Sequence, residues 1–209
     1  MKNLIIVCAG GFGREICNTA PDCYGYGTKF VLKGFLDDTE SPLKDYPGYP
    51  PVLGSIDSYV IEPDDVFVCA LGSVEGKKKC VQRIEARGGE FISLVHKTAT
   101  IARNTTLGRG CIIQEDARIS CDIRIGNFVT IQDECMMGHD VCIGDWSHLN
   151  PRTFLGGGVI LGEGVHLFPY AIVHPRRRVG DYASVGAGAF VIRNVKPHAT
   201  VYGNPAREL

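Results

Sequence analysis

The sequence predicts two architectures in succession, a small parallel α/β sheet and then a parallel β-helix. From Val95 to Val191, every sixth residue is aliphatic or methionine, and the 3.6-residue period of an α-helix cannot produce such a pattern. Before residue 95, apolar strand-like runs alternate with helix-like segments, as in parallel α/β sheets. We therefore expect one domain over residues 1–94 and a second over residues 95–209.

Composition narrows the classes of ligand. The 209 residues include 22 Lys plus Arg and 23 Asp plus Glu, without a basic tail. Because polyanion binding needs a concentrated positive face, we expect no nucleic acid partner and favour small molecules. The apolar run at the start is too short for a signal-peptide core, and nothing approaches a membrane span. Nine cysteines without a Cys-x-x-Cys pair argue against a disulfide framework or a cysteine zinc site. We expect a cytoplasmic protein with free thiols and no membrane insertion.

In the first half, residues 4–8 are predicted as a strand that leads through a glycine-rich loop into a helix ending near residue 19. Further strands are predicted at 30–36, 66–70 and 91–95, and a helix at about 74–86. The stretch 42–54, rich in Pro and Gly, is predicted as turns. This order of elements indicates a Rossmann-like small parallel sheet.

The loops after the first two strands are candidates for binding a nucleotide-linked sugar. Glycines between a first strand and its helix let backbone amides approach a phosphate, and an aspartate ending the second strand is placed to hold a ribose hydroxyl. The candidate substrate-binding residues are Gly10, Gly11, Phe12, Gly13, Asp37, Asp38 and Gly72. Cys8 stands where the first glycine of Gly-x-Gly-x-x-Gly is usual, so a tight turn with a helix cap is the alternative interpretation. Fewer than 100 residues leave no room for a complete dinucleotide fold.

In the second half, the position four residues after each aliphatic one is small or β-branched in every repeat except at Arg177. Gly follows the aliphatic residue in eight repeats, from Gly108 to Gly186, which we interpret as bends because Gly tolerates unusual backbone angles. A strict six-residue period is explained by short strands that are separated by corners and stacked coil upon coil. Because a buried unpaired guanidinium is costly, we expect the corner at Arg177 to bulge outward.

This repeat resembles that of the hexapeptide acyltransferases. Further segments strengthen the resemblance: Ala9–Glu15, Gly138–Asp140, Ile143–Asp145, Ser147–His148, Val185–Ala189 and Val201–Ala206. Together they are similar to bacterial nucleotide-sugar N- and O-acetyltransferases, such as the UDP-4-amino-sugar, GDP-perosamine and sialic acid acetyltransferases. The resemblance covers nearly the whole chain and implies a left-handed β-helix with three repeats per triangular coil.

The resemblance also implies roles for individual residues. His139 corresponds to the catalytic base, and Asp140 to the acidic neighbour that polarises it. Gly157 matches a glycine whose N–H faces the thioester carbonyl, and three repeats per coil place it beside His139. The expected acetyl-CoA-binding residues are His148, Gly157, Ala187, Arg176 and Arg178. For His148 a packing role at a trimer interface is the alternative, and for the two arginines a solvated corner.

The activity implied is transfer of an acetyl group from acetyl-CoA, without a metal, to a nucleotide-linked sugar in bacterial surface glycan biosynthesis. The family forms homotrimers. An amino acceptor is favoured because it needs less activation than a hydroxyl, and O-acetylation of sialic acid or another sugar is the alternative. Two further alternatives are a γ-type carbonic anhydrase-like metal lyase and a sugar-nucleotide binder without catalysis. The sequence leaves open which nucleotide and which sugar are bound.

Overall fold

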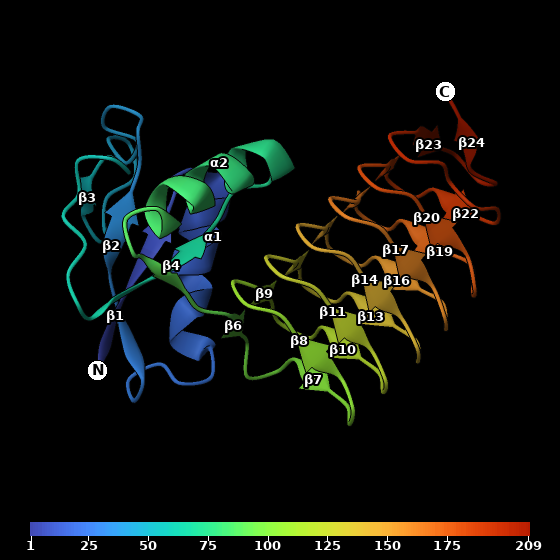
Figure 1. Ribbon diagram of the computed structural model, residues 1–209, viewed down its shortest axis with the longest axis horizontal. Helices are drawn as coiled ribbons and strands as arrows, with labels where there is room; N and C mark the ends of the chain where they lie inside the picture. Colours follow the sequence, from blue (N-terminus) through green and yellow to red (C-terminus); the bar gives the residue numbers. More distant parts are fainter. The chain divides into compact units, whose positions relative to one another are not determined.

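The computed structural model describes residues 1–209. Contacts within the chain group it into two compact units (Figure 1), unit one over Met1–His96 and unit two over Lys97–Leu209. Neither of its two α-helices combines the length and apolar character that a membrane span requires. All nine cysteines are free thiols.

Unit one is built on a five-stranded parallel sheet in the order β3-β2-β1-β4-β5. Its elements are β1 (Lys2–Val7), α1 (Gly11–Thr19), a 3-10 turn (Ala20–Asp22), β2 (Phe30–Leu36), β3 (Val52–Gly54), β4 (Asp65–Cys69), α2 (Val74–Glu85), β5 (Glu90–Phe91) and β6 (Leu94–Val95). Central strands buried on both faces explain the continuous apolar runs in β1 and β4. The predicted α/β sheet is confirmed. Strand β3 was not predicted, because its three residues lie within the stretch of Pro and Gly.

A polar network ties β2 and β4 together at the start of β4. Asp65 is only 4% exposed, and its carboxylate accepts hydrogen bonds from Lys33 Nζ (2.8 Å), the Tyr59 hydroxyl (2.7 Å) and the Glu62 N–H (2.8 Å). Burial acts to raise the pKa of Asp65, but these hydrogen bonds outweigh it and hold the pKa below its ordinary value of 3.8. The buried carboxylate is therefore charged and fully partnered.

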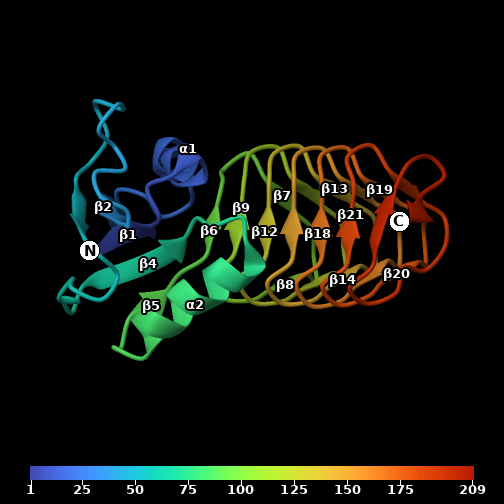
Figure 2. The ribbon, with the colours of Figure 1, turned by 90° about the horizontal axis from the view of Figure 1, so that it is seen from above.

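Unit two is a parallel β-helix with three faces, visible as stacked coils in Figure 2. Face one contains β7 (Thr100–Ile101), β10 (Arg118–Ile119), β13 (Met136–Met137), β16 (Phe154–Leu155), β19 (Ile172–Val173) and β22 (Phe190–Val191). Face two contains β8 (Thr106–Leu107), β11 (Arg124–Ile125), β14 (Cys142–Ile143), β17 (Ile160–Leu161) and β20 (Arg178–Val179). Face three contains β9 (Ile112–Ile113), β12 (Thr130–Ile131), β15 (His148–Leu149), β18 (His166–Leu167), β21 (Ser184–Val185), β23 (Thr200–Tyr202) and β24 (Arg207–Glu208).

The register of these faces confirms the predicted coil. Arg118 pairs with Met136 and Met136 with Phe154, so equivalent residues recur every 18 positions. The second residue of most strands points inward, and from Ile113 to Val191 these side chains form a buried aliphatic column on each face. Each coil therefore buries its apolar side against the next one. Left-handed winding stays a prediction.

The glycines of the repeat have a different role from the one expected. Positive φ angles do recur every six residues, but they fall three positions after the aliphatic residue, for example at Asp140 (60°) and Arg176 (60°). A Cβ on Gly108 would lie 2.4 Å from the Gly126 carbonyl oxygen, and one on Gly144 2.4 Å from Gly162. These glycines are therefore needed because neighbouring coils approach closely, and their interpretation as bends was wrong.

The corner at Arg177 does not bulge as predicted. Ile160 N–H donates to the Arg177 carbonyl (3.0 Å) and Arg176 N–H to the Gly157 carbonyl (2.9 Å), so the ladder between coils is unbroken. Arg177 is half-buried and its enclosed Nε has no hydrogen-bond partner. Because the Arg side chain is long, its charged end can reach solvent while the backbone stays regular, and no bulge is needed.

Candidate functional site

The predicted substrate-binding residues of unit one meet at one edge of its sheet. β1 pairs in parallel with β2 on one side and β4 on the other, so the loops after all three strands leave from the same edge. Strands β2 and β3 are added on one side of β1, and strands β4 and β5 on the other. Ligands of open α/β sheets bind at such switch points, outside the carboxyl ends of the strands. The glycine loop (residues 9–13), the aspartate pair and Gly72 all belong to this edge.

The glycines of this loop divide into two roles. Gly10 is the N-cap of α1, and a Cβ on Gly10 or Gly11 would meet nothing within 4 Å. Their backbone is therefore open to an anionic group at the helix N-terminus. A Cβ on Gly13 would instead lie 1.9 Å from the Cys8 carbonyl oxygen, so Gly13 lets α1 pack closely on β1.

The two aspartates are engaged within the chain. Asp37 accepts hydrogen bonds from the N–H groups of Ala9 (2.7 Å) and Thr39 (2.8 Å), which fixes the start of the glycine loop. Asp38 accepts from Ile56 N–H (2.9 Å) and from Arg83 on α2 (2.6 Å). The Arg83 guanidinium holds the pKa of Asp38 below its ordinary value. Sequence reasoning missed Arg83 because it lies far from Asp38 in the chain.

In unit two, the corner between β13 and β14 carries His139. Asp140 takes a positive φ of 60° at this corner, and its Oδ2 lies 2.6 Å from His139 Nδ1. If Nδ1 carries the proton, Nε2 has a free lone pair and can accept a proton from a nucleophile. The imidazole is 66% exposed and therefore accessible to a ligand.

Gly157 lies one coil further along, directly against the imidazole. A Cβ at this position would be 2.9 Å from His139 Nε2 and 3.0 Å from Cε1, and the Gly157 N–H donates no hydrogen bond within the chain. An imidazole with an available Nε2 and a backbone donor beside it can together accept a proton and hold an oxyanion. The predicted stacking of His139 and Gly157 is thus confirmed.

Two residues on the preceding coil also lie at this corner and were not among the predicted site residues. Cys121 and Asp122 lie 18 positions before His139 and Asp140. Asn104 Nδ2 donates to the Asp122 carboxylate (3.0 Å). Hydrogen bonds from the Cys121 thiol and from Asn104 lower the pKa of Asp122, and the nearby His139 acts in the same direction. The 18-residue spacing is the sequence signal that places them there.

Comparisons with known proteins agree with this architecture. Residues 3–84 match the PglD N-terminal domain. UDP-N-acetylbacillosamine N-acetyltransferase of Bacillus subtilis is 34% identical over 120 residues, a match that covers 54% of this chain and 51% of that protein. The match thus spans about half the length of the curated relative.

Solved structures extend the comparison to the whole chain. Perosamine N-acetyltransferase from Caulobacter crescentus, in complex with CoA and GDP-perosamine, has a TM-score of 0.89 at 23% identity, covering 100% of this chain and 97% of that one. The acetyltransferase domain of PglB from Neisseria gonorrhoeae has a TM-score of 0.73 at 24% identity, with both chains covered completely. The chain has the fold of these acetyltransferases. The predicted resemblance to nucleotide-sugar acetyltransferases is confirmed.

Within this acetyltransferase fold, not all predicted site residues lie together in one chain. Arg176 follows Asp140 two coils on, at the same corner, and Arg178 lies on face two in β20. His148 lies on face three, 4% exposed, with its ring centroid 5.1 Å from that of His166. Ala187 is exposed at another corner, between β21 and β22. The structure therefore groups Arg176 with the imidazole and separates His148 and Ala187 from it.

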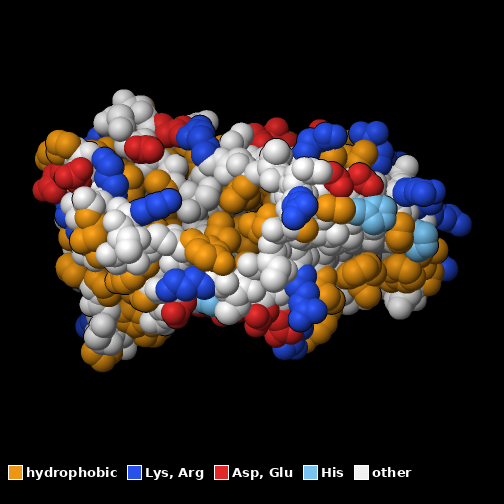
Figure 3. All heavy atoms as spheres, turned by 90° about the horizontal axis from the view of Figure 1, so that it is seen from below, with side chains coloured by type: hydrophobic (Ala, Val, Ile, Leu, Met, Phe, Trp, Pro, Cys, Tyr) orange, Lys and Arg blue, Asp and Glu red, His pale blue; other side chains and the backbone are white.

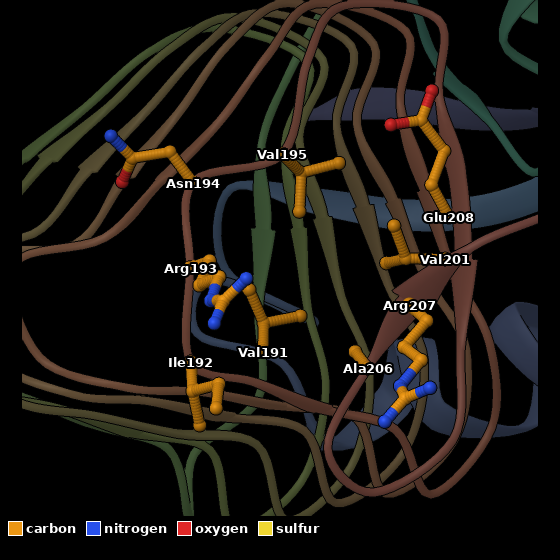
Figure 4. A pocket seen from close by; sticks show the side chains of 9 residues that line it. All are labelled: Val191, Ile192, Arg193, Asn194, Val195, Val201, Ala206, Arg207 and Glu208. Atoms are coloured by element: carbon orange, nitrogen blue, oxygen red, sulfur yellow. The ribbon is translucent and has the colours of Figure 1, made fainter.

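A hollow lies at the last coils of unit two (Figure 4), and His139 is not among the residues that line it. It has a volume of about 290 Å³. Its lining residues are Val191, Ile192, Arg193, Asn194, Val195, Val201, Ala206, Arg207 and Glu208. None of the predicted site residues contributes to it. No three His, Cys, Asp or Glu side chains are arranged to hold a metal ion.

Proposed function

We propose that this protein transfers the acetyl group of acetyl-CoA to an amino group of a nucleotide-linked sugar. The observation that carries the proposal is the corner where Asp140 lies 2.6 Å from His139 Nδ1 while Gly157 packs against Nε2. The relative from Bacillus subtilis is an N-acetyltransferase, and the Caulobacter structure contains CoA and GDP-perosamine. These names support a sugar nucleotide as acceptor and acetyl-CoA as co-substrate here.

His139 is the general base of the proposed reaction. Its Nε2 accepts a proton from the neutral amine as the amine nitrogen attacks the acetyl carbonyl. The Gly157 N–H donates a hydrogen bond to the developing oxyanion. Asp140 accepts from Nδ1, which keeps the proton off Nε2 in the resting state and stabilises the imidazolium that forms. His139 then returns the proton to the departing thiolate, so an amide and free CoA are the products.

We assign binding of the acceptor to residues 1–94 and acyl transfer to residues 95–209. The open backbone at Gly10 and Gly11 supports phosphate binding, and Asp37 supports it indirectly by fixing Ala9. Arg176 and Arg178 are both exposed, as a role in binding the CoA phosphates requires. The proposed physiological role is in bacterial surface glycan biosynthesis. We place the protein in the cytoplasm, because free cysteines are typical of that reducing compartment.

The proposed assembly is a homotrimer. On face one, the outward side chains of Met136, Phe154 and Ile172 stack on consecutive coils and are 43%, 38% and 39% exposed. Figure 3 shows hydrophobic side chains at the surface of one side of the molecule. A second copy covering this column would remove apolar surface from water. Phe154→Glu is expected to shift the mass in light scattering from trimer to monomer, and an unchanged trimer would contradict the assignment of this column.

The activity is tested with purified protein, acetyl-CoA and a panel of UDP- and GDP-linked 4-amino sugars. Product mass is the better readout, because nine free cysteines react with thiol reagents. We expect an increase of one acetyl group on one sugar nucleotide, and its formation should be slower by about 10²-fold or more in His139→Ala. No acetylated product with any amino sugar would contradict the N-acetyltransferase, and a product only with hydroxyl acceptors would favour the O-acetyltransferase.

A further inference from the structure

The segment between β2 and β3 encloses a hollow of its own in unit one. This 39–52 hollow has a volume of about 480 Å³, within the range of roughly 300–1,000 Å³ that is typical of small-molecule pockets. All of its lining residues belong to the segment 39–52, and they include two tyrosines and four prolines. Because proline fixes its own φ angle, the backbone around the hollow has little conformational freedom to lose when a ligand binds.

Two tyrosines of the hollow fasten this segment to the rest of unit one. The Tyr49 hydroxyl accepts a hydrogen bond from Asn18 Nδ2 on α1 (3.3 Å). The Tyr49 ring also lies edge-on to Phe35 of β2, with the ring centroids 6.4 Å apart. The Arg14 guanidinium of α1 lies over the ring of Tyr46, with its Cζ 3.4 Å from the ring centroid. The segment is therefore held beside α1 by side chains at both tyrosines.

The 39–52 hollow begins next to the glycine loop. One Asp37 carboxylate oxygen accepts from the Ala9 N–H of that loop (2.7 Å), and the other accepts from the Thr39 N–H (2.8 Å). Thr39 is the first residue that lines the hollow. In α/β nucleotide sites the phosphates lie at the glycine loop, and the ribose lies at the acidic residue that ends the second strand. A base attached to that ribose is therefore placed beside the segment that starts at Thr39.

Arg14 is a cation available for the phosphates. It lies in the first turn of α1, and no carboxylate of the chain pairs with it. Stacking on Tyr46 uses the face of the guanidinium and leaves the N–H groups at its edge for an acceptor. Arginine binds phosphate through two parallel N–H···O bonds, which require a fixed plane. Tyr46 thus holds Arg14 in an orientation suited to an anionic ligand.

We propose that the 39–52 hollow binds the base of the acceptor nucleotide, and that Arg14, held on Tyr46, binds its phosphates. The proposal rests on the proposed function, because it takes the acceptor to be a nucleotide-linked sugar. The Tyr46 side chain is 44% exposed although Arg14 covers one face of its ring. The remaining ring surface can stack on a planar base, an interaction that tolerates any of the bases.

The proposal is tested by calorimetry on the full chain with UDP and GDP, at low and at high salt. Tyr46→Ala should weaken binding of the preferred nucleotide by about tenfold or more, because base stacking is lost. Tyr46→Phe keeps the ring and should bind as wild type does. Tyr24→Ala, which removes another exposed tyrosine of unit one, should also bind normally. Arg14→Ala should weaken binding by about tenfold or more and reduce its dependence on salt, because one contact with a phosphate is gone.

Thermal unfolding of each variant checks that it is folded. Equal affinities of wild type and Tyr46→Ala would overturn the assignment of the base, and an unchanged affinity and salt dependence in Arg14→Ala would overturn that of the phosphates. Loss of binding in Tyr46→Phe as large as in Tyr46→Ala would show that the hydroxyl is the contact and would refute stacking. Wild type that binds neither nucleotide would also overturn the proposal. The proposed function is decided separately by the mass of the product, since acetylation with normal binding in both alanine variants would place the base elsewhere and leave the activity established.

Discussion

Gly157→Ala tests whether the position of the His139 imidazole controls the reaction. The new Cβ would lie 2.9 Å from Nε2, a distance that real Cβ atoms essentially never show. Carbon atoms in good contact are about 3.5–4.0 Å apart, so the ring must retreat by roughly 0.5–1 Å. Gly157 does not have a positive φ, and alanine is therefore compatible with its backbone. The substitution displaces the base without removing it or the Gly157 N–H.

The expected effect on catalysis follows from this displacement. A misplacement near 1 Å can lower a rate by about 10²-fold, so we expect kcat to fall by roughly 10- to 100-fold. The free energy of unfolding should change by less than about 1 kcal/mol, because Gly→Ala at a compatible position is close to neutral. Steady-state kinetics with the preferred amino sugar measure kcat, and chemical denaturation measures stability.

A double-mutant cycle separates the steric effect from others. In a His139→Ala background the new methyl group has no ring to displace, so Gly157→Ala should cause no further loss. An equal loss in both backgrounds would show that the methyl group acts on the thioester instead. Full activity of the single variant would refute the idea that the ring position matters.

Three further predictions concern other parts of the molecule. Asp140→Asn should lower kcat by about tenfold or more, because the imidazolium loses its charged partner; an unchanged kcat would contradict this role. Replacing Arg176 and Arg178 by alanine should raise the KM for acetyl-CoA about tenfold, the equivalent of one charged hydrogen bond, and an unchanged KM would assign both to a solvated corner. Asp65→Asn should destabilise the protein by about 2 kcal/mol at pH 7. Because the pKa of Asp65 is lowered on folding, its stabilisation is complete above the ordinary value of 3.8 and is lost as the pH falls through the lower folded value. The difference in denaturation midpoint between wild type and Asp65→Asn should therefore narrow in acid, and a difference independent of pH would contradict this.

The β-helix could be predicted almost completely from the sequence because its contacts repeat. Each coil packs on the next with the same register, so burial imposes the same residue class every six positions, and Gly157 could be placed beside His139 by counting. The same counting places Cys121 and Asp122 on the coil before His139 and Asp140. The glycines at positions such as 108 and 144 were misinterpreted, because a period shows where small residues recur but does not show which atoms exclude a side chain.

In unit one, local patterns identified the strands and helices, because apolar runs and glycine loops are properties of neighbouring residues. Partners that lie far apart in the chain left no such trace. The pairing of Asp38 with Arg83 depends on how α2 lies along the carboxyl edge, which no local period encodes. Residue order alone thus determined the two architectures and the histidine corner, whereas the packing of nonadjacent elements decided which charged side chains meet.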